Sequence, residues 1–153
     1  MTPFKLAYRY LDIREFPGGV DNPLIQWWLL RAGLPHGSHD EVPWCGAFMD
    51  AVMWECGARG PAFPARARHW LTAGTPVALQ DAKPGWDVVI LKRGDGWQPG
   101  SEVLNAPGHV GLFDKESEGR VWLLGGNQGD RVSVKSFPVD LILGIRRLGA
   151  GEV

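Results

Sequence analysis

Residues 84–91 read PGWDVVIL and mark the point where the sequence changes from helix-forming to strand-forming patterns. Pro84 and Gly85 are turn residues, and the apolar, β-branched run that follows them is typical of a buried strand. Further strands are expected over residues 109–113, 120–124, 132–134 and 141–145. Because short turns separate most of these strands, the second half of the chain predicts an antiparallel sheet.

The sequence before residue 84 predicts helices. Thr2-Pro3 and Asn22-Pro23 each place a capping residue before a proline, which is a common start of a helix. The helices are expected over residues 3–15, 23–32, about 44–56 and 65–72. Helices first and strands second indicate an α+β fold, and 153 residues suit a single domain, 1–153.

The charge of the chain is almost balanced, with 16 Lys and Arg against 17 Asp and Glu. This balance argues against a dedicated nucleic-acid binder, which usually carries a basic stripe. No apolar stretch approaches the roughly 20 residues that span a bilayer, and residues 1–10 have no apolar core of a signal peptide. We therefore expect a soluble protein without membrane insertion, which is either made in the cytoplasm or exported by a route that needs no cleaved leader. We also expect a monomer.

The two cysteines, Cys45 and Cys56, are expected near opposite ends of the third helix. At about 1.5 Å per residue they lie roughly 16 Å apart, whereas a disulfide needs Cα atoms within about 7 Å. Pro43 places Cys45 in the first helical turn, where free N–H groups and the helix dipole stabilise a thiolate and an oxyanion. Cys45 is therefore a candidate nucleophile, with a buried core cysteine as the alternative, and Cys56 is expected to be a core residue.

A thiol nucleophile needs a base, and the chain offers four histidines. His109 opens a predicted strand, which would hold its ring rigidly at the edge of a cleft. His36 and His39 lie in the loop before Cys45 and are alternatives, whereas His69 lies within a predicted helix. Rigidity favours His109 modestly.

The base in turn needs a group that accepts a hydrogen bond from its second ring nitrogen. Asn127 and Gln128 follow Gly125-Gly126 at the end of the strand after His109, and antiparallel pairing brings such positions together. Asn127 is a candidate for this role, but its local setting favours a turn-forming role instead. The sequence has no Cys-x-x-Cys pair and no two histidines at i, i+4, so neither a metal nor another cofactor is expected.

Five motifs occur in a fixed order along the chain: EFPG at 15–18 followed by Asn22-Pro23, PWCGAF at 43–48, ARHW at 67–70, GHVG at 108–111 and GGNQ at 125–128. This ordered set resembles the CHAP and NlpC/P60 branch of the papain-like cysteine peptidases over roughly residues 5–148. The likeness is strongest to a short subgroup common among phage and prophage lysis proteins. It implies a papain-like fold in which N-terminal helices, one carrying Cys45, pack on an antiparallel sheet that carries His109.

The resemblance implies a peptidoglycan hydrolase that cleaves an amide bond of the murein peptide. Such an enzyme is an endopeptidase or an N-acetylmuramoyl-L-alanine amidase, here of the endolysin type, made in the bacterial cytoplasm and acting on the cell wall. Carried over by position, Cys45 is the nucleophile, His109 the base and Asn127 the third member. The chain departs from the family where relatives often have a carboxylate before the third member, an uninterrupted Pro-Gly-Asp turn and an Asp before the cysteine.

Contacts to the substrate are expected from residues around the proposed nucleophile. Trp44 and Trp97 would form cleft walls, Asp40 and Glu41 would meet a cationic group of the stem peptide, and Gln128 would contact the substrate. For the tryptophans the alternative is packing, and for the two acidic residues it is a solvated loop. Two other functions remain open, an interbacterial amidase effector with an immunity protein as partner and a non-catalytic wall-binding module.

Overall fold

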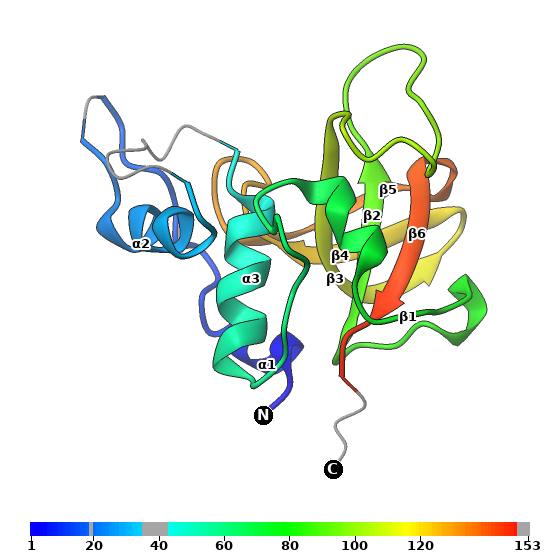
Figure 1. Cartoon of the computed structure of the whole chain (residues 1–153), viewed down its shortest axis with the longest axis horizontal. Coiled ribbons are helices and arrows are strands. Elements are labelled where there is room, and N and C mark those ends of the chain that lie inside the picture. The colour runs from blue at the N-terminus through cyan, green and yellow to red at the C-terminus, as the bar shows by residue number, and fades with distance from the viewer. Residues whose placement is uncertain (19, 35–42, 150–153) are drawn as a thin grey trace.

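Three helices precede a six-stranded antiparallel sheet in the computed structural model, which describes residues 1–18, 20–34 and 43–149 (Figure 1). The helices are α1 (Pro3–Tyr8), α2 (Pro23–Arg31) and α3 (Cys45–Glu55), and short 3₁₀ helices cover Ala67–Thr72, Leu79–Asp81 and Val139–Leu141. The strands are β1 (Thr75–Pro76), β2 (Asp87–Lys92), β3 (Gly108–Ser117), β4 (Arg120–Gly125), β5 (Ser133–Pro138) and β6 (Ile142–Arg147). They lie in the order β1-β6-β2-β3-β4-β5, so the predicted α+β class is confirmed.

The first two helices begin at the predicted capping residues. Asn22 accepts a hydrogen bond from the Leu24 N–H at 2.9 Å, and Thr2 accepts one from the Lys5 N–H at 3.3 Å. Helix α1 ends at Tyr8, well before residue 15, because the backbone turns and residues 12–15 bond to the segment 130–132 instead. The expected fourth helix is the 3₁₀ helix Ala67–Thr72.

The continuous apolar run of β2 is explained by burial on both faces of the sheet. Val88 and Ile90 belong to the core between the sheet and the helices, whereas Val89 and Leu91 belong to a second core on the opposite face. Because successive side chains of a strand alternate between faces, a strand buried on both sides needs apolar residues at every position.

The strands differ from the prediction mainly at their ends. Strand β3 continues to Ser117. Strand β5 covers residues 133–138 instead of 132–134, and β6 covers residues 142–147 instead of 141–145. The two-residue strand β1, which pairs with β6, was not predicted. A strand this short has no alternation of apolar and polar residues, and only its position beside β6 defines it.

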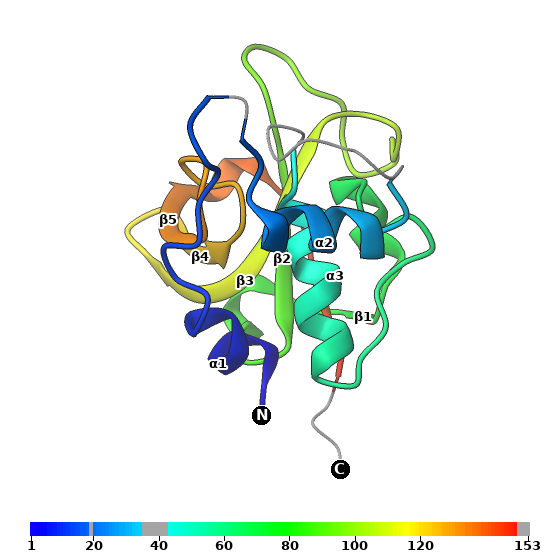
Figure 2. The same cartoon turned by 90° about the vertical axis from the view of Figure 1, so that its left-hand side faces the viewer.

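The register of the sheet places the start of β3 and the end of β4 at the same edge. Leu112 pairs with Leu124, so the β4 residues that follow run back alongside the first residues of β3. The N-terminal end of α3 lies against this edge, as the turned view in Figure 2 shows. Within the described ranges, no helix is both long and apolar enough to cross a membrane.

Candidate active site

Cys45 is the first residue of α3, at the end of the helix that faces the sheet edge. Trp44 occupies the capping position without a side-chain hydrogen bond to the helix, and the first intrahelical bond joins the Phe48 N–H to the Trp44 carbonyl. The N–H groups of residues 45–47 therefore have no partner within the helix, which is the usual state of a first turn. They provide donors and partial positive charge beside the sulfur.

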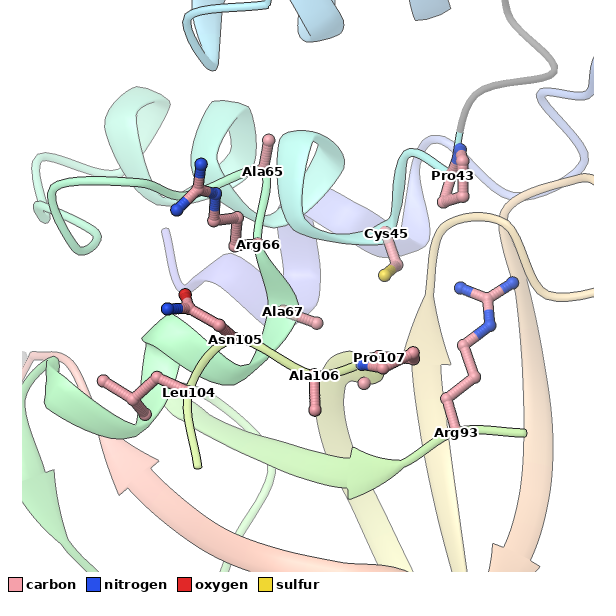
Figure 3. A pocket seen from close by; sticks show the side chains of 11 residues that line it. Pro43, Cys45, Ala65, Arg66, Ala67, Arg93, Leu104, Asn105, Ala106 and Pro107 are labelled. Atoms are coloured by element: carbon pink, nitrogen blue, oxygen red, sulfur yellow. The ribbon is translucent and has the colours of Figure 1, made fainter. Parts of the chain in front are cut away.

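The Cys45 side chain is 3% exposed and lines a cavity of about 660 Å³ (Figure 3). Burial alone would raise the pKa of the thiol. The charge and hydrogen bond of His109, the Val110 backbone N–H and the charge of Arg93 outweigh burial and lower the pKa of Cys45 to about 7. Burial raises the pKa of Cys56, so the structure distinguishes the two thiols, both of which are free.

His109, the second residue of β3, joins Cys45 to Gln128. Its Nε2 lies 2.8 Å from Oε1 of Gln128, while the Gln128 amide nitrogen donates to the carbonyls of Leu123 (3.1 Å) and Ser133 (2.7 Å). These two bonds fix the orientation of the amide, so Oε1 accepts and Nε2 of His109 donates. In neutral His109, Nδ1 is then the basic nitrogen, which leaves it for proton exchange with the thiol.

Two glycines make room for the Gln128 amide. A Cβ at Gly125 would lie 2.8 Å from Oε1 of Gln128, and a Cβ at Gly111 would lie 3.4 Å from the same atom. Phe137 on β5 packs against His109 with ring centroids 5.4 Å apart. The ring of His109 is thus held by a hydrogen bond at one edge and by an aromatic neighbour at its face.

The structure corrects the assignment of Asn127 as the residue that orients His109. In the described part of the chain it is Gln128 that accepts the hydrogen bond from the ring, and this buried residue was expected to contact the substrate. Asn127 has φ +57, a left-handed conformation that asparagine tolerates, so it forms the turn after β4. This turn points the next side chain, Gln128, back toward the sheet.

Trp44 is fully buried and is not a cleft wall, which corrects a second prediction. Its ring packs against Trp28 and Phe48, and its Nε1 donates a 2.9 Å hydrogen bond to Oε2 of Glu15. A fully buried indole does not meet a substrate. Glu15, which the resemblance matched without a physical role, therefore helps to position the residue that precedes Cys45.

Of the other expected substrate residues, Trp97 does not join the site in the described structure. Trp97 is 85% exposed and is not among the residues that line the cavity beside Cys45. Asp40 and Glu41 lie outside the described residues, as do His36 and His39. His69 lies with its Nε2 3.4 Å from Oδ1 of Asn105, which lines the cavity beside Cys45, and His69 itself does not line that cavity.

The far wall of the cavity is the segment before β3, including Leu104–Gly108. Arg68 is fully buried and holds this segment through hydrogen bonds to the carbonyls of Pro107 (2.9 Å), Gly100 (2.8 Å) and Val103 (3.1 Å). Its position in the ARHW motif was the only sequence signal, because nothing in a sequence shows which loop a buried arginine will bind.

Arg93, like Arg68, is a residue of the site that the sequence analysis did not identify. It lines both the cavity beside Cys45 and a smaller cavity of about 260 Å³ beside His109. It directly follows β2, and because Leu91 pairs with His109 the end of β2 lies beside the start of β3. Across the described ranges, no group of three or more His, Cys, Asp or Glu residues is arranged to hold a metal ion.

Comparison with known proteins gives no matching family model and no matching curated protein. Several solved structures are similar in fold, including the following two. NlpC1 from Trichomonas vaginalis has a TM-score of 0.56 and 17% identity over 95% of this chain, and a protein from Staphylococcus aureus described as similar to a lipoprotein of the NLP/P60 family has a TM-score of 0.54 and 16% identity over 96%. The chain covers 42% and 40% of those two proteins. On this evidence the chain has the papain-like α+β fold of NlpC/P60 proteins.

Proposed function

We propose that this protein is a cysteine hydrolase that cleaves an amide bond of the murein peptide. The observation that carries the proposal is the chain of contacts from Cys45 through His109 to Gln128, on a fold shared with NlpC/P60 proteins. A lowered thiol pKa, a base with one free ring nitrogen and a buried group that orients the base are the parts that acyl transfer requires.

The proposed reaction begins with attack of the Cys45 thiolate on the amide carbonyl. The oxyanion of the tetrahedral intermediate is stabilised by N–H groups of the first turn of α3. The His109 imidazolium donates a proton to the leaving amine as the C–N bond breaks, which yields a thioester. His109 then takes a proton from water and the hydroxide attacks the thioester carbonyl. The C–S bond breaks, which releases the carboxylic acid product and restores the Cys45 thiolate beside the His109 imidazolium.

The finer parts of the proposal concern the biological role. The resemblance favours an endolysin of a phage or prophage that acts on the bacterial cell wall, as an endopeptidase or an amidase. The same chemistry would serve an interbacterial effector with an immunity protein. The mass of the murein fragments identifies the bond that is cut, and the neighbouring genes separate lysis from an effector role.

The first prediction tests turnover. Cys45→Ala should retain the fold and release no fragments from purified murein, because the attacking sulfur is gone, whereas Cys56→Ala should remain active. Mass spectrometry of the digest measures the fragments, and thermal unfolding checks both variants. Fragment release by Cys45→Ala would overturn the mechanism, and an inactive parent protein that still binds murein would favour a wall-binding module.

The second prediction concerns the pH dependence of the thiol. Cys45 should be alkylated by iodoacetamide with an apparent pKa near 7, and the rate should fall below that pH because the thiolate is protonated. His109→Ala should move the midpoint upward, and peptide mapping should show slower labelling of Cys56 at pH 7. Equal rates for both cysteines would contradict the prediction.

A further inference from the structure

The described residues that line the cavity beside Cys45 carry positive charge without a compensating acidic residue. Arg66 and Arg93 line it, and the described lining residues include no Asp or Glu. The remaining lining is apolar or uncharged, including Leu104, Pro107 and Asn105. In Figure 3 the two arginines lie on either side of the Cys45 sulfur. A substrate that crosses the thiol would therefore pass both guanidinium groups.

The guanidinium of Arg93 has no ion pair or hydrogen bond with any residue in the described ranges, although the side chain is partly buried. Other partly or fully buried arginines do have partners. Arg147 forms two bonds to Asp87, at 2.6 and 2.8 Å, and Arg68 binds three carbonyls. An arginine that lacks such partners in a cavity has its donors free for a ligand, and its planar fork suits a carboxylate.

We propose that Arg93 binds a free carboxylate of the peptide substrate beside the scissile amide, so that the enzyme selects acidic peptides over their amidated forms. This inference rests on the proposed function, because it identifies the substrate class of the same cleft. Arg93 is well placed for it, since it lines both the cavity beside Cys45 and the cavity beside His109. Arg66 is exposed and packs 5.1 Å from the Phe63 ring, so it contributes a weaker, more distant charge.

Arg93 also lies close enough to lower the pKa of Cys45. Support of the thiolate and recognition of a carboxylate are separable, because the first affects every substrate equally. The Cys45→Ala substitution removes the thiolate, so peptide binding to this variant measures the recognition of the carboxylate alone. The third prediction therefore uses binding rather than turnover as its main readout.

The probes are two murein stem tripeptides with the sequence L-Ala-γ-D-Glu-L-Lys, one with free carboxylates and the other with each carboxylate converted to a carboxamide. Isothermal titration at low salt should show that Cys45→Ala binds the acid about ten- to a hundredfold more tightly than the amide, which is typical of a charged hydrogen bond. In the double variant Cys45→Ala, Arg93→Gln, the affinity for the acid should be within about twofold of the affinity for the amide. Arg93→Lys, which keeps the charge without the fork, should retain part of it.

Arg59→Gln is the matched control, because it removes the same charge from an exposed site outside the cavity. It should keep the preference for the acid. Equal binding of acid and amide, an unchanged preference in Arg93→Gln, or no binding of either peptide would overturn the inference. If the preference depends on Arg93 while the parent protein releases no murein fragments, the carboxylate site stands and the hydrolase proposal fails. If the parent protein releases murein fragments but Cys45→Ala shows no preference for the acid, the hydrolase proposal stands and the carboxylate site fails.

Discussion

The Gln128 side chain makes three hydrogen bonds at the site, and together they fix its amide group. One amide group accepts from His109 and donates to two backbone carbonyls, at the end of β4 and the start of β5. Because both amide donors are used, the oxygen cannot rotate away from the ring. The orientation of the base therefore depends on the same three bonds that close the turn after β4.

The fourth prediction follows from these bonds. Gln128→Ala should lower kcat by about tenfold, because the ring of His109 loses its orienting hydrogen bond. It should also lower the free energy of unfolding by about 1–3 kcal/mol, since the Leu123 and Ser133 carbonyls lose their donor. Steady-state hydrolysis of a murein peptide and denaturant unfolding measure the two effects.

Asn127→Gly is the matched control for this experiment. It removes the neighbouring amide but suits the φ of +57 at that position. It should leave kcat within about twofold of the parent protein. A larger loss for Asn127→Gly than for Gln128→Ala would restore the assignment made from the sequence.

At the scale of elements, the site depends on the irregular segment between β2 and β3. This segment forms the cavity wall opposite α3, yet its backbone is held by Arg68 from the 3₁₀ helix Ala67–Thr72. A long connection without its own regular structure needs such external bonds to keep one conformation. The wall of the cleft is thus built by a contact between two segments that are remote in the sequence.

The fifth prediction tests this contact with Arg68→Lys. Lysine has a single amine and cannot reach three carbonyls with the geometry of the guanidinium fork. We expect the free energy of unfolding to fall by about 1–3 kcal/mol and chymotrypsin to cleave faster at Leu104. Arg66→Lys, two residues away and exposed, is the matched control and should change neither. Equal cleavage rates in the two variants would contradict the proposed anchor.

At the scale of the whole molecule, the proposed catalytic pair lies where the helical half meets the sheet. Helix α3 supplies Cys45, β3 supplies His109 and the turn after β4 supplies Gln128. The spacing between the halves is set by close packing at Gly126, where an added Cβ would lie 2.7 Å from the Trp44 ring and 2.9 Å from Cβ of Phe48. Interiors this tightly packed transmit a small displacement rather than absorb it.

The sequence by itself determined the α+β class, the helix starts at the capped prolines and the candidates Cys45 and His109. These depend on local patterns, namely caps, continuous apolar runs and the position of a cysteine in a first turn. It did not distinguish Asn127 from its neighbour, because adjacent residues share one local pattern and only the left-handed turn decides which side chain faces the ring. It also misassigned Trp44, since burial depends on what packs around a residue.

Only the tertiary structure decided the remaining parts of the site. The hydrogen bond of Glu15, the loop anchored by Arg68 and the place of Arg93 in the cavity each depend on segments distant in the sequence. A hydrogen bond between such segments leaves no periodic signal in either one. The chemistry of the nucleophile is thus readable from local sequence, whereas the shape and charge of the cleft arise when the helical half and the sheet pack together.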